Sequence, residues 1–178
     1  MKYCSECGAP VQLRVPTDDD RPRYICDGCG RIHYENPKMV VGCVPEWEDR
    51  ILLCRRNIEP QKDLWTLPAG YLENGEGVAD GARRETLEES GAIVDHLEPY
   101  LLIDIVHIRQ IYLMFRGRMQ TPEFKVTPES AEVVLMREDQ IPWDQLAFRA
   151  IEKTLRYYFR DRAEGRFPFR VRPVGKRD

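Results

Sequence analysis

The sequence predicts a layered α/β domain preceded by a small cysteine-rich module. Two observations lead to this prediction. Two CxxC pairs fall within the first 30 residues, and the rest of the chain combines short aliphatic runs with two helical patterns. We therefore expect a cysteine module at 1–36, an α/β domain at 37–160 and a basic C-terminal tail at 161–178.

Composition argues against several classes of protein. The 178-residue chain has a net charge of −3, which disfavours a protein built mainly to bind nucleic acid or anionic lipid. No apolar run approaches the ~18 residues of a membrane span, and the N-terminus resembles neither a signal nor a transit segment. We therefore expect a cytoplasmic protein that has no membrane partner and does not use nucleic acid as a partner.

The cysteine pairs predict a metal site in the first module. Thiolates two residues apart share one metal from a single turn, and two such turns complete the tetrahedral site that suits Zn²⁺. The four ligands would be Cys4, Cys7, Cys26 and Cys29. A set of four cysteines leaves no open coordination position, so the zinc would be structural. Two disulfides are the alternative, which a reducing cytosol disfavours.

Aliphatic runs predict the strands of the second domain. The runs at 39–44 and 51–56 flank a polar turn and predict a hairpin. A further short strand is expected at 64–70, one bent strand or two strands at 101–119, and another strand at 131–136. Cys43 and Cys54 lie in the first two runs, where we expect them to be buried as small apolar side chains.

Two helices are expected in this domain. The first runs from about Val78 to Ser90 and is ended by Gly91. The second begins at Asp144 as N-cap and places one apolar face toward the core. That face consists of Ala147, Ile151, Leu155 and Tyr158. The tail beyond Arg160 is rich in arginine, and two readings stay open: a disordered end, or an arm that packs on another subunit.

The first predicted helix carries an unusual cluster of acids. Glu85, Glu88 and Glu89 lie three and four residues apart, so their carboxylates share one helix face and repel one another. A divalent cation with hard oxygen ligands, Mg²⁺ or Mn²⁺, would reverse that repulsion. Arg84 precedes Glu88 by four residues and is placed to pair with it.

The spacing of this cluster resembles the signature of the Nudix hydrolases, G-x5-E-x7-R-E-U-x-E-E-x-G-U, where U is a bulky aliphatic residue. At a frequency of ~7% for each residue type, seven fixed matches arise by chance about once in 10⁸ starts. Thr86 and Ala92 depart from the aliphatic rule, but both are packing positions. The matching positions are Gly70, Glu76, Arg84, Glu85, Glu88, Glu89 and Gly91.

The resemblance implies an α/β/α sandwich with a mixed sheet and a metal-dependent hydrolase. It implies that Glu85, Glu88, Glu89 and the Gly70 carbonyl hold Mg²⁺ or Mn²⁺, while Glu76 and Arg84 support the helix by ion pairing. The substrate class would be a nucleoside diphosphate linked to another moiety. The general base stays open among a glutamate of the signature, Glu129 and Glu132, the last two in a late loop.

A narrower resemblance covers roughly residues 31–148. The stretches IHYENPKMVVGCV, LWTLPAGYLENGE and IPWDQLAF are similar to zinc-ribbon Nudix enzymes that cleave FAD or ADP-ribose and release AMP. The run SQPWPFPxS of the NADH diphosphatases is absent, so NADH is not the expected substrate. Damaged nucleoside triphosphates, RNA 5′ ends and a nucleotide-sensing regulator without catalysis remain alternatives.

Several side chains are candidates for substrate contact. Trp65, Tyr71 and Tyr112 would stack on an aromatic base, unless they fill the core. Arg55 and Arg56 follow a strand and would meet phosphate, unless they are only a solvated strand end. Because related dinucleotide-cleaving members of the family share substrate sites between subunits, the resemblance also implies a homodimer.

Overall fold

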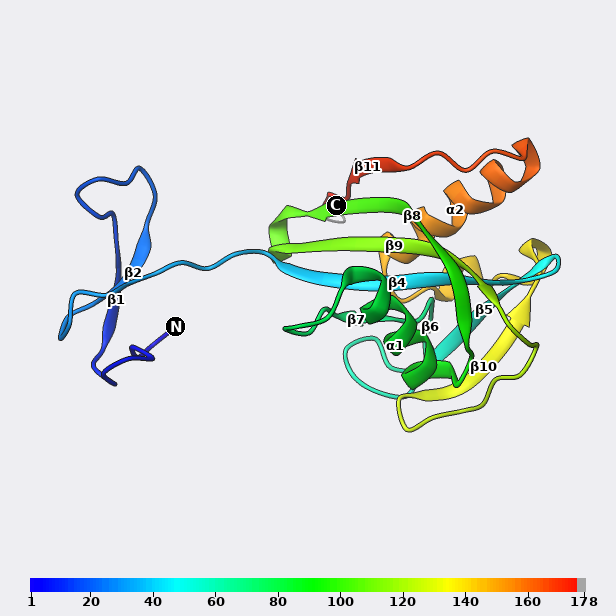
Figure 1. Ribbon diagram of the computed structural model, residues 1–178, viewed down its shortest axis with the longest axis horizontal. Helices are drawn as coiled ribbons and strands as arrows, with labels where there is room; N and C mark the ends of the chain where they lie inside the picture. The colour runs from blue at the N-terminus through cyan, green and yellow to red at the C-terminus, as the bar shows by residue number, and fades with distance from the viewer. Residues whose placement is uncertain (176–178) are drawn as a thin grey trace. The chain divides into compact units, whose positions relative to one another are not determined.

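The computed structural model describes residues 1–175 and divides the chain into two compact units. One unit spans Met1–Pro37 and the other begins at Lys38 (Figure 1). The last three residues of the expected C-terminal tail, 176–178, lie outside the described residues. Within residues 1–175, no helix is both long and apolar enough to cross a membrane.

The first unit is a three-stranded antiparallel sheet with almost no apolar core. Its strands are β1 (Val11–Arg14), β2 (Arg23–Cys26) and β3 (Ile32–His33), in the order β1-β2-β3. Within residues 1–37 the buried apolar side chains are those of Cys4 and Cys26. So little burial does not stabilise a sheet of this size, and a cross-link through the cysteines is required.

The second unit is built on a mixed sheet with strand order β10-β5-β4-β9-β8-β11. Strand β4 runs parallel to β9 and β11 runs parallel to β8, whereas the other neighbours on this path are antiparallel. Two short strands extend it, with β6 paired to β5 and β7 paired to β4. The strands are β4 (Lys38–Trp47), β5 (Arg50–Arg56), β6 (Trp65–Thr66), β7 (Ala69–Tyr71), β8 (Val94–Ile105), β9 (Gln110–Met119), β10 (Ser130–Met136) and β11 (Arg170–Pro173).

The segment at 101–119 forms parts of two antiparallel strands, which settles the open choice between one strand and two. Strand β8 already begins at Val94, and a 3₁₀ turn at Val106–Ile108 connects it to β9. Arg109 closes this turn in the left-handed region, at φ 54°. The reversal places Leu102 opposite Leu113 within a continuous ladder.

The two helices, α1 (Val78–Ser90) and α2 (Arg149–Glu164), cover opposite faces of the sheet (Figure 1). Alternate residues of β9 show this division, because successive side chains of a strand point to opposite faces. Phe115 packs in the same cluster as Ala82 of α1, whereas Met114 packs in the same cluster as Ile151 of α2. The predicted α/β/α sandwich with a mixed sheet is therefore confirmed.

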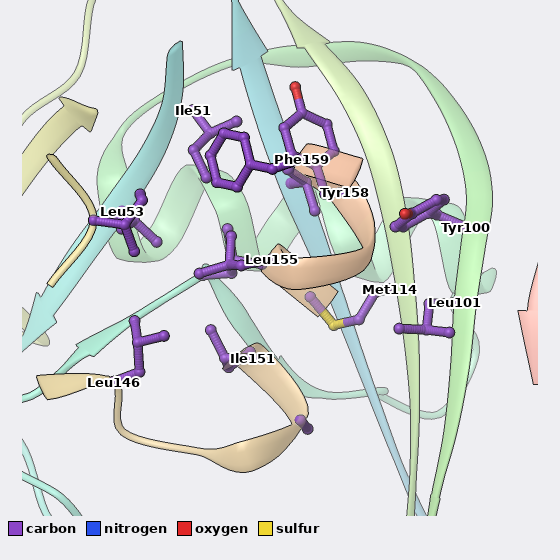
Figure 2. Packing of buried hydrophobic residues seen from close by; sticks show 14 of the residues in the cluster. Ile51, Leu53, Tyr100, Leu101, Met114, Leu146, Ile151, Leu155, Tyr158 and Phe159 are labelled. Carbon is purple, nitrogen blue, oxygen red and sulfur yellow. The ribbon is translucent and has the colours of Figure 1, made fainter. Parts of the chain in front are cut away.

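Helix α2 closes the larger of the two cores. Figure 2 shows Ile151, Leu155 and Phe159 of α2 turned toward Leu53 and Met114 of the sheet. Burial of each such side chain contributes ~1.5–3 kcal/mol, so this face anchors the helix without help from charged groups. The apolar face predicted from Ala147, Ile151, Leu155 and Tyr158 is buried as expected.

The expected start of this helix at Asp144 is wrong. Asp144 lies in a separate 3₁₀ turn, Trp143–Gln145, and Leu146 is extended. The chain then pairs with the edge of β6, where the Ala147 N–H donates to the Trp65 carbonyl at 2.8 Å. Because that tertiary hydrogen bond needs an extended backbone, the helix begins only at Arg149, with Phe148 as N-cap.

The described part of the C-terminal tail is ordered and packs on its own domain, so the reading as a disordered end is wrong for residues up to 175. Helix α2 continues to Glu164 and ends at Gly165, which has φ 67°. Strand β11 then joins the edge of the sheet beside β8. The fully buried Asp161 connects the two elements, since it accepts hydrogen bonds from Tyr100 and Arg170.

Candidate functional site

Helix α1 carries the acidic cluster and packs closely on the sheet. Ala82, Thr86 and Ser90 are fully buried on the sheet side, where their small size permits close approach. The two hydroxyls donate to helix carbonyls, Thr86 to Ala82 at 2.7 Å and Ser90 to Thr86 at 2.6 Å. Gly91 ends the helix in the left-handed conformation, at φ 69°. The acids on the neighbouring face are thereby held by a rigid element.

Arg84 organises the acids around it. Its Nε and Nη2 donate to the two carboxylate oxygens of Glu76 at 3.0 and 2.7 Å. Its Nη1 donates to Glu85 at 2.7 Å and to Glu88 at 3.0 Å, and Nη2 also reaches the Tyr71 carbonyl at 3.1 Å. The Arg84 hydrogen bonds lower the pKa of Glu76 to about 2. One guanidinium thus orients three carboxylates and the loop that precedes the helix.

Glu89 is the most deeply buried acid of the cluster, with 6% of its surface exposed. Its Oε2 accepts one hydrogen bond, from the Ala69 N–H at 3.2 Å. Burial raises the pKa of Glu89 to about 8, and burial also raises the pKa of Glu85 despite the adjacent Arg84. Both carboxylates therefore lie where a bound cation would strongly favour their ionised form.

Gly70 lies directly against Glu85. A Cβ atom at position 70 would fall 2.3 Å from the Glu85 carboxylate, so only glycine permits this contact. The backbone of Gly70 in β7 thus lies beside the Glu85 carboxylate, and both carry hard oxygen atoms, the donor type that Mg²⁺ and Mn²⁺ prefer.

The three helix carboxylates form an open arrangement rather than a closed one. Within residues 1–175, only the four cysteines bring three or more ligand atoms of His, Cys, Asp or Glu within 4.8 Å of one another. Mg²⁺ usually keeps several waters and is held by one or two carboxylates together with substrate phosphates. The spread of Glu85, Glu88 and Glu89 suits that mode of binding.

The two candidate acids of the late loop, Glu129 and Glu132, have different surroundings in the fold. Burial is the main cause of the raised pKa of Glu85 and of Glu89, and the charge of Glu129 adds to it, so Glu129 lies in the neighbourhood of both acids. The Asn57 N–H donates to the Glu129 carbonyl at 2.8 Å and anchors the loop there. Glu132 instead forms an ion pair with Arg55 at 3.2 Å.

A cleft of about 500 Å³ opens beside Gly70. Of the predicted substrate contacts, Tyr71, Tyr112 and Arg56 line this cleft. Its size and its mixture of aromatic and polar side chains are typical of a nucleotide-sized ligand site.

Trp65 and Arg55 do not line the cleft, unlike the other three predicted substrate contacts. Trp65 is 8% exposed and belongs to the core beneath α2. Arg55 is turned toward Glu132, and its Nε also donates to the Asp63 carbonyl at 3.0 Å. Neighbouring residues of a strand point to opposite faces, which explains why Arg56 reaches the cleft and Arg55 does not.

Two side chains of the cleft were not anticipated. The Phe148 ring lies 5.2 Å from the Arg56 guanidinium, whose Nε donates to the Pro60 carbonyl at 2.9 Å. Gln110 donates to the Tyr71 hydroxyl at 3.0 Å. Phe148 directly follows Ala147, which the sequence predicted to be buried, so the pattern indicated that this segment packs against the domain. Gln110 begins strand β9 and had no comparable signal.

The four cysteines of the first unit gather as their spacing predicts. Their sulfur atoms all lie within 4.8 Å of one another, with Cys7 and Cys26 at 3.4 Å and Cys4 and Cys29 at 3.8 Å. A disulfide bond requires ~2.05 Å, so the alternative of two disulfides is excluded for this structure.

The backbone of this unit is arranged around the sulfur atoms. The N–H groups of Cys29 and Gly28 point to the Cys26 sulfur, at 3.4 and 3.3 Å, and lower the pKa of its thiol to about 6. Gly8 and Gly30 close the two turns with φ of 74° and 72°. Four sulfur donors in two such turns fit a tetrahedral zinc site.

Comparison with known proteins identifies both units. The family model of the NUDIX domain matches residues 36–167, and a zinc-ribbon model described as Nudix N-terminal matches residues 2–35. The crystal structure of a NUDIX hydrolase from Nitrosomonas europaea superimposes with a TM-score of 0.95 at 47% identity. That comparison covers 99% of this chain and 100% of the other.

Two curated relatives are more distant. The NAD-capped RNA hydrolase NudC of Salmonella heidelberg is 26% identical over 86% of this chain and 60% of its own length. The ADP-ribose pyrophosphatase of Methanocaldococcus jannaschii is 38% identical over 34% of this chain and 36% of its own length. The chain thus spans less than two thirds of the length of either relative. The family models nevertheless account for nearly all of residues 2–167, and the chain belongs to the Nudix hydrolase family with an N-terminal zinc ribbon.

Proposed function

We propose that the protein is a Mg²⁺- or Mn²⁺-dependent pyrophosphatase that splits ADP-ribose or FAD at the diphosphate bond and releases AMP. One observation carries this proposal. Ala69 and Gly70 line a cleft of about 500 Å³ together with aromatic side chains, and both contact the buried acids of α1. Gly70 lies directly against the Glu85 carboxylate, and the Ala69 N–H donates to Glu89. The name of the Methanocaldococcus relative, an ADP-ribose pyrophosphatase, favours ADP-ribose as the first substrate to test.

The residues present fit the metal that the family implies. Glu85, Glu88, Glu89 and the Gly70 carbonyl would hold it, because they supply hard oxygen donors and two of the acids are buried without a full set of protein partners. When bound, the cation would neutralise the charge of the diphosphate and lower the pKa of a coordinated water.

The chain itself supplies the remaining groups. We assign the proton-accepting role to Glu129, since it lies close enough to Glu85 and Glu89 for its charge to add to the effect of burial in raising their pKa, whereas Glu132 is paired with Arg55. Arg56 faces the cleft as a cation for a substrate phosphate, and its stacking on Phe148 restricts its orientation.

The aromatic side chains of the cleft provide surfaces for the adenine or its partner group. Tyr112 is half-buried in the cleft wall, and Gln110 holds the hydroxyl of Tyr71. A rigid aromatic contact loses little conformational entropy on binding, which favours a planar base at this position.

A substrate panel tests the proposal. The protein is incubated with Mg²⁺ and ADP-ribose, FAD, NADH, an oxidised deoxyguanosine triphosphate or NAD-capped RNA, and kcat/KM is compared across the five. We expect ADP-ribose or FAD to rank first, with AMP as product. If one member of the panel binds tightly and none is hydrolysed, the protein would be a nucleotide sensor rather than an enzyme. Mass photometry of the same sample tests the expected homodimer.

We also propose that the four cysteines hold one structural Zn²⁺. Elemental analysis of protein purified without added metal should find one zinc per chain. Chelation should raise hydrogen exchange within residues 1–37 and leave the second unit protected, because the first unit has almost no apolar core of its own. Unchanged exchange in the first unit after zinc loss would contradict the structural role.

A further inference from the structure

The connection between β9 and β10, residues 120–129, carries Glu129 past the C-terminal end of α1 (Figure 1). We call it the β9–β10 loop. All of its side chains are exposed except that of Thr127, which is half-buried. Apolar burial therefore contributes little to the position of this loop, and hydrogen bonds must hold it in place.

One set of hydrogen bonds joins the β9–β10 loop to the end of α1. The Lys125 N–H donates to the Ser90 carbonyl at 2.8 Å, and the Thr127 hydroxyl donates to the Glu89 carbonyl at 3.2 Å. Carbonyls in the last turn of a helix have no partner within the helix itself. Gly91 leaves room for this contact, since a Cβ atom there would fall 2.6 Å from the Lys125 Cγ. The loop thus satisfies the open end of the helix.

A second set of hydrogen bonds joins the loop to Asn57, directly beyond β5. The Asn57 N–H donates to the Glu129 carbonyl at 2.8 Å, and the Asn57 Nδ2 donates to the Pro128 carbonyl at 3.1 Å. The Glu129 N–H in turn donates to the Thr127 hydroxyl at 3.3 Å. Both backbone polar groups of Glu129 are therefore fixed, while its side chain is exposed.

The Thr127 hydroxyl connects the two sets. A threonine hydroxyl offers one donor and two acceptor positions, and here all three are used. The hydroxyl donates to the Glu89 carbonyl and accepts the N–H groups of Glu129 and of Ser130, the latter at 3.2 Å. A single oxygen atom thus joins the most deeply buried acid of α1 to the loop residue assigned as proton acceptor.

The same local turn occurs a second time in the loop, without the contact to α1. Residues 121–123 and 127–129 share the sequence Thr-Pro-Glu, and in the first copy the Glu123 N–H donates to the Thr121 hydroxyl at 3.4 Å. Threonine hydroxyls commonly form such turns with a nearby backbone N–H. In the part of the chain that the structure describes, the first threonine has no hydrogen bond to α1. The contact with Glu89 therefore distinguishes the second copy.

We propose that Thr127 is a positioning residue for the hydrolysis, because its hydroxyl fixes the β9–β10 loop, and with it Glu129, against the helix that carries the acids. This role rests on the function proposed above and on Glu129 as proton acceptor. A general base must lie within hydrogen-bond reach of the proton that it removes, or one water further away. A small shift of the loop would therefore slow the chemical step.

Thr127→Val tests this role, because valine resembles threonine in shape but has no hydroxyl. We expect kcat for the best substrate of the panel to fall about tenfold. KM should change by less than about twofold, since Thr127 does not line the cleft. Thr127→Ser keeps the hydroxyl and should restore most of kcat. An equal loss in both variants, or no loss in Thr127→Val, would overturn the proposal.

Thr121→Val is the matched control. It removes the same kind of turn from the same loop, but it breaks no hydrogen bond to α1, and it should leave kcat unchanged. An equal fall of kcat in Thr121→Val and Thr127→Val would show that the loop needs its local turns rather than the contact with Glu89. That result would also overturn the proposal.

A double-mutant cycle tests whether Thr127 acts through Glu129. Glu129→Gln alone should lower kcat by about 10²-fold, as expected for the loss of a general base. Adding Thr127→Val should lower kcat no further, because the position of a base that has been removed no longer matters. A further tenfold loss in the double variant would show that Thr127 acts on another group, and it would contradict the positioning role.

Hydrogen exchange separates the anchoring of the loop from the proposed function. Amides within residues 124–130 should exchange about fivefold faster in Thr127→Val than in the wild type, and Thr127→Ser should match the wild type. Unchanged exchange in Thr127→Val of an active enzyme would overturn the anchoring and leave the proposed function standing. Faster exchange in a protein that hydrolyses no member of the panel would contradict the function and the positioning role, while the anchoring would stand.

Discussion

Helices α1 and α2 cover opposite faces of one sheet, and they are held there by different interactions. Against the sheet, α1 buries the small residues Ala82, Thr86 and Ser90, whereas α2 buries large apolar side chains. The large side chains of α2 include Ile151, Leu155, Tyr158 and Phe159. The packing of α2 supports the fold, while α1 combines close packing with a cluster of acids beside the cleft.

Each helix also buries an acid, and the two acids differ in their partners. Burial opposes ionisation of Asp161 in α2, but its hydrogen bonds with Arg170 and Tyr100 lower its pKa below the ordinary value. The Glu89 carboxylate in α1 accepts a hydrogen bond from the Ala69 N–H, and burial raises its pKa to about 8. The charge of Asp161 is thus compensated by a cation of the protein, whereas Glu89 forms no salt bridge within residues 1–175.

The largest expected effect is on activity. Glu89→Gln should lower kcat by about 10³-fold, or ~4 kcal/mol, because the amide cannot supply an anionic metal ligand. The folded state should be unaffected, since the amide oxygen can still accept the Ala69 N–H. Steady-state kinetics with Mg²⁺ measure the loss, and Glu164→Gln at the exposed end of α2 is the matched control. Near-normal turnover of Glu89→Gln would refute the ligand role.

The pH dependence of the stability of the same variant tests the difference between the buried acids of α1 and α2. Without added Mg²⁺ or Mn²⁺, the raised pKa of Glu89 means that the folded state resists its ionisation. The free energy of unfolding should therefore decrease as pH rises from about 4.5, the ordinary pKa, to about 8. Urea unfolding at several pH values should show a weaker decrease for Glu89→Gln. A parallel decrease in both proteins would assign the effect to another group.

A leucine-to-alanine pair compares the packing of the two helices. Leu155→Ala in α2 removes a fully buried side chain and should lower the free energy of unfolding by about 3 kcal/mol. Leu87→Ala in α1 removes a side chain that is 51% exposed and should cost less than about 1 kcal/mol. Urea unfolding measures both. Equal losses would mean that α1 depends on apolar burial as much as α2 does.

The smallest expected effect tests the charge compensation in α1. Arg84→Lys keeps one charge but loses the paired contacts with the two oxygens of Glu76, since an ammonium lacks the planar fork of a guanidinium. Glu85 and Glu88 would be less well oriented, and kcat should fall about tenfold. Arg83→Lys is the control, because Arg83 pairs only with the exposed Asp80. If the two variants had identical kinetics, Arg84 would not be needed to position the acids.

The fold was largely predictable because its elements follow local rules. Gly91 ends α1 where expected, and Ile151 and Leu155 lie on the buried face that their spacing predicts. The start of α2 was missed since the Ala147 N–H is used by the Trp65 carbonyl, which is distant in the sequence. The C-terminal tail was missed for a similar reason, because β11 is stabilised by pairing with β8.

For the candidate site, the sequence alone determined which residues belong to the two metal-binding patterns, because CxxC turns and helix spacing are set over a few residues. Only the tertiary structure decided that Arg56 lines the cleft and Arg55 does not, that Glu132 pairs with Arg55, and that Trp65 belongs to the core. These features depend on which strands become neighbours, and that pairing arises from contacts between segments far apart in the chain.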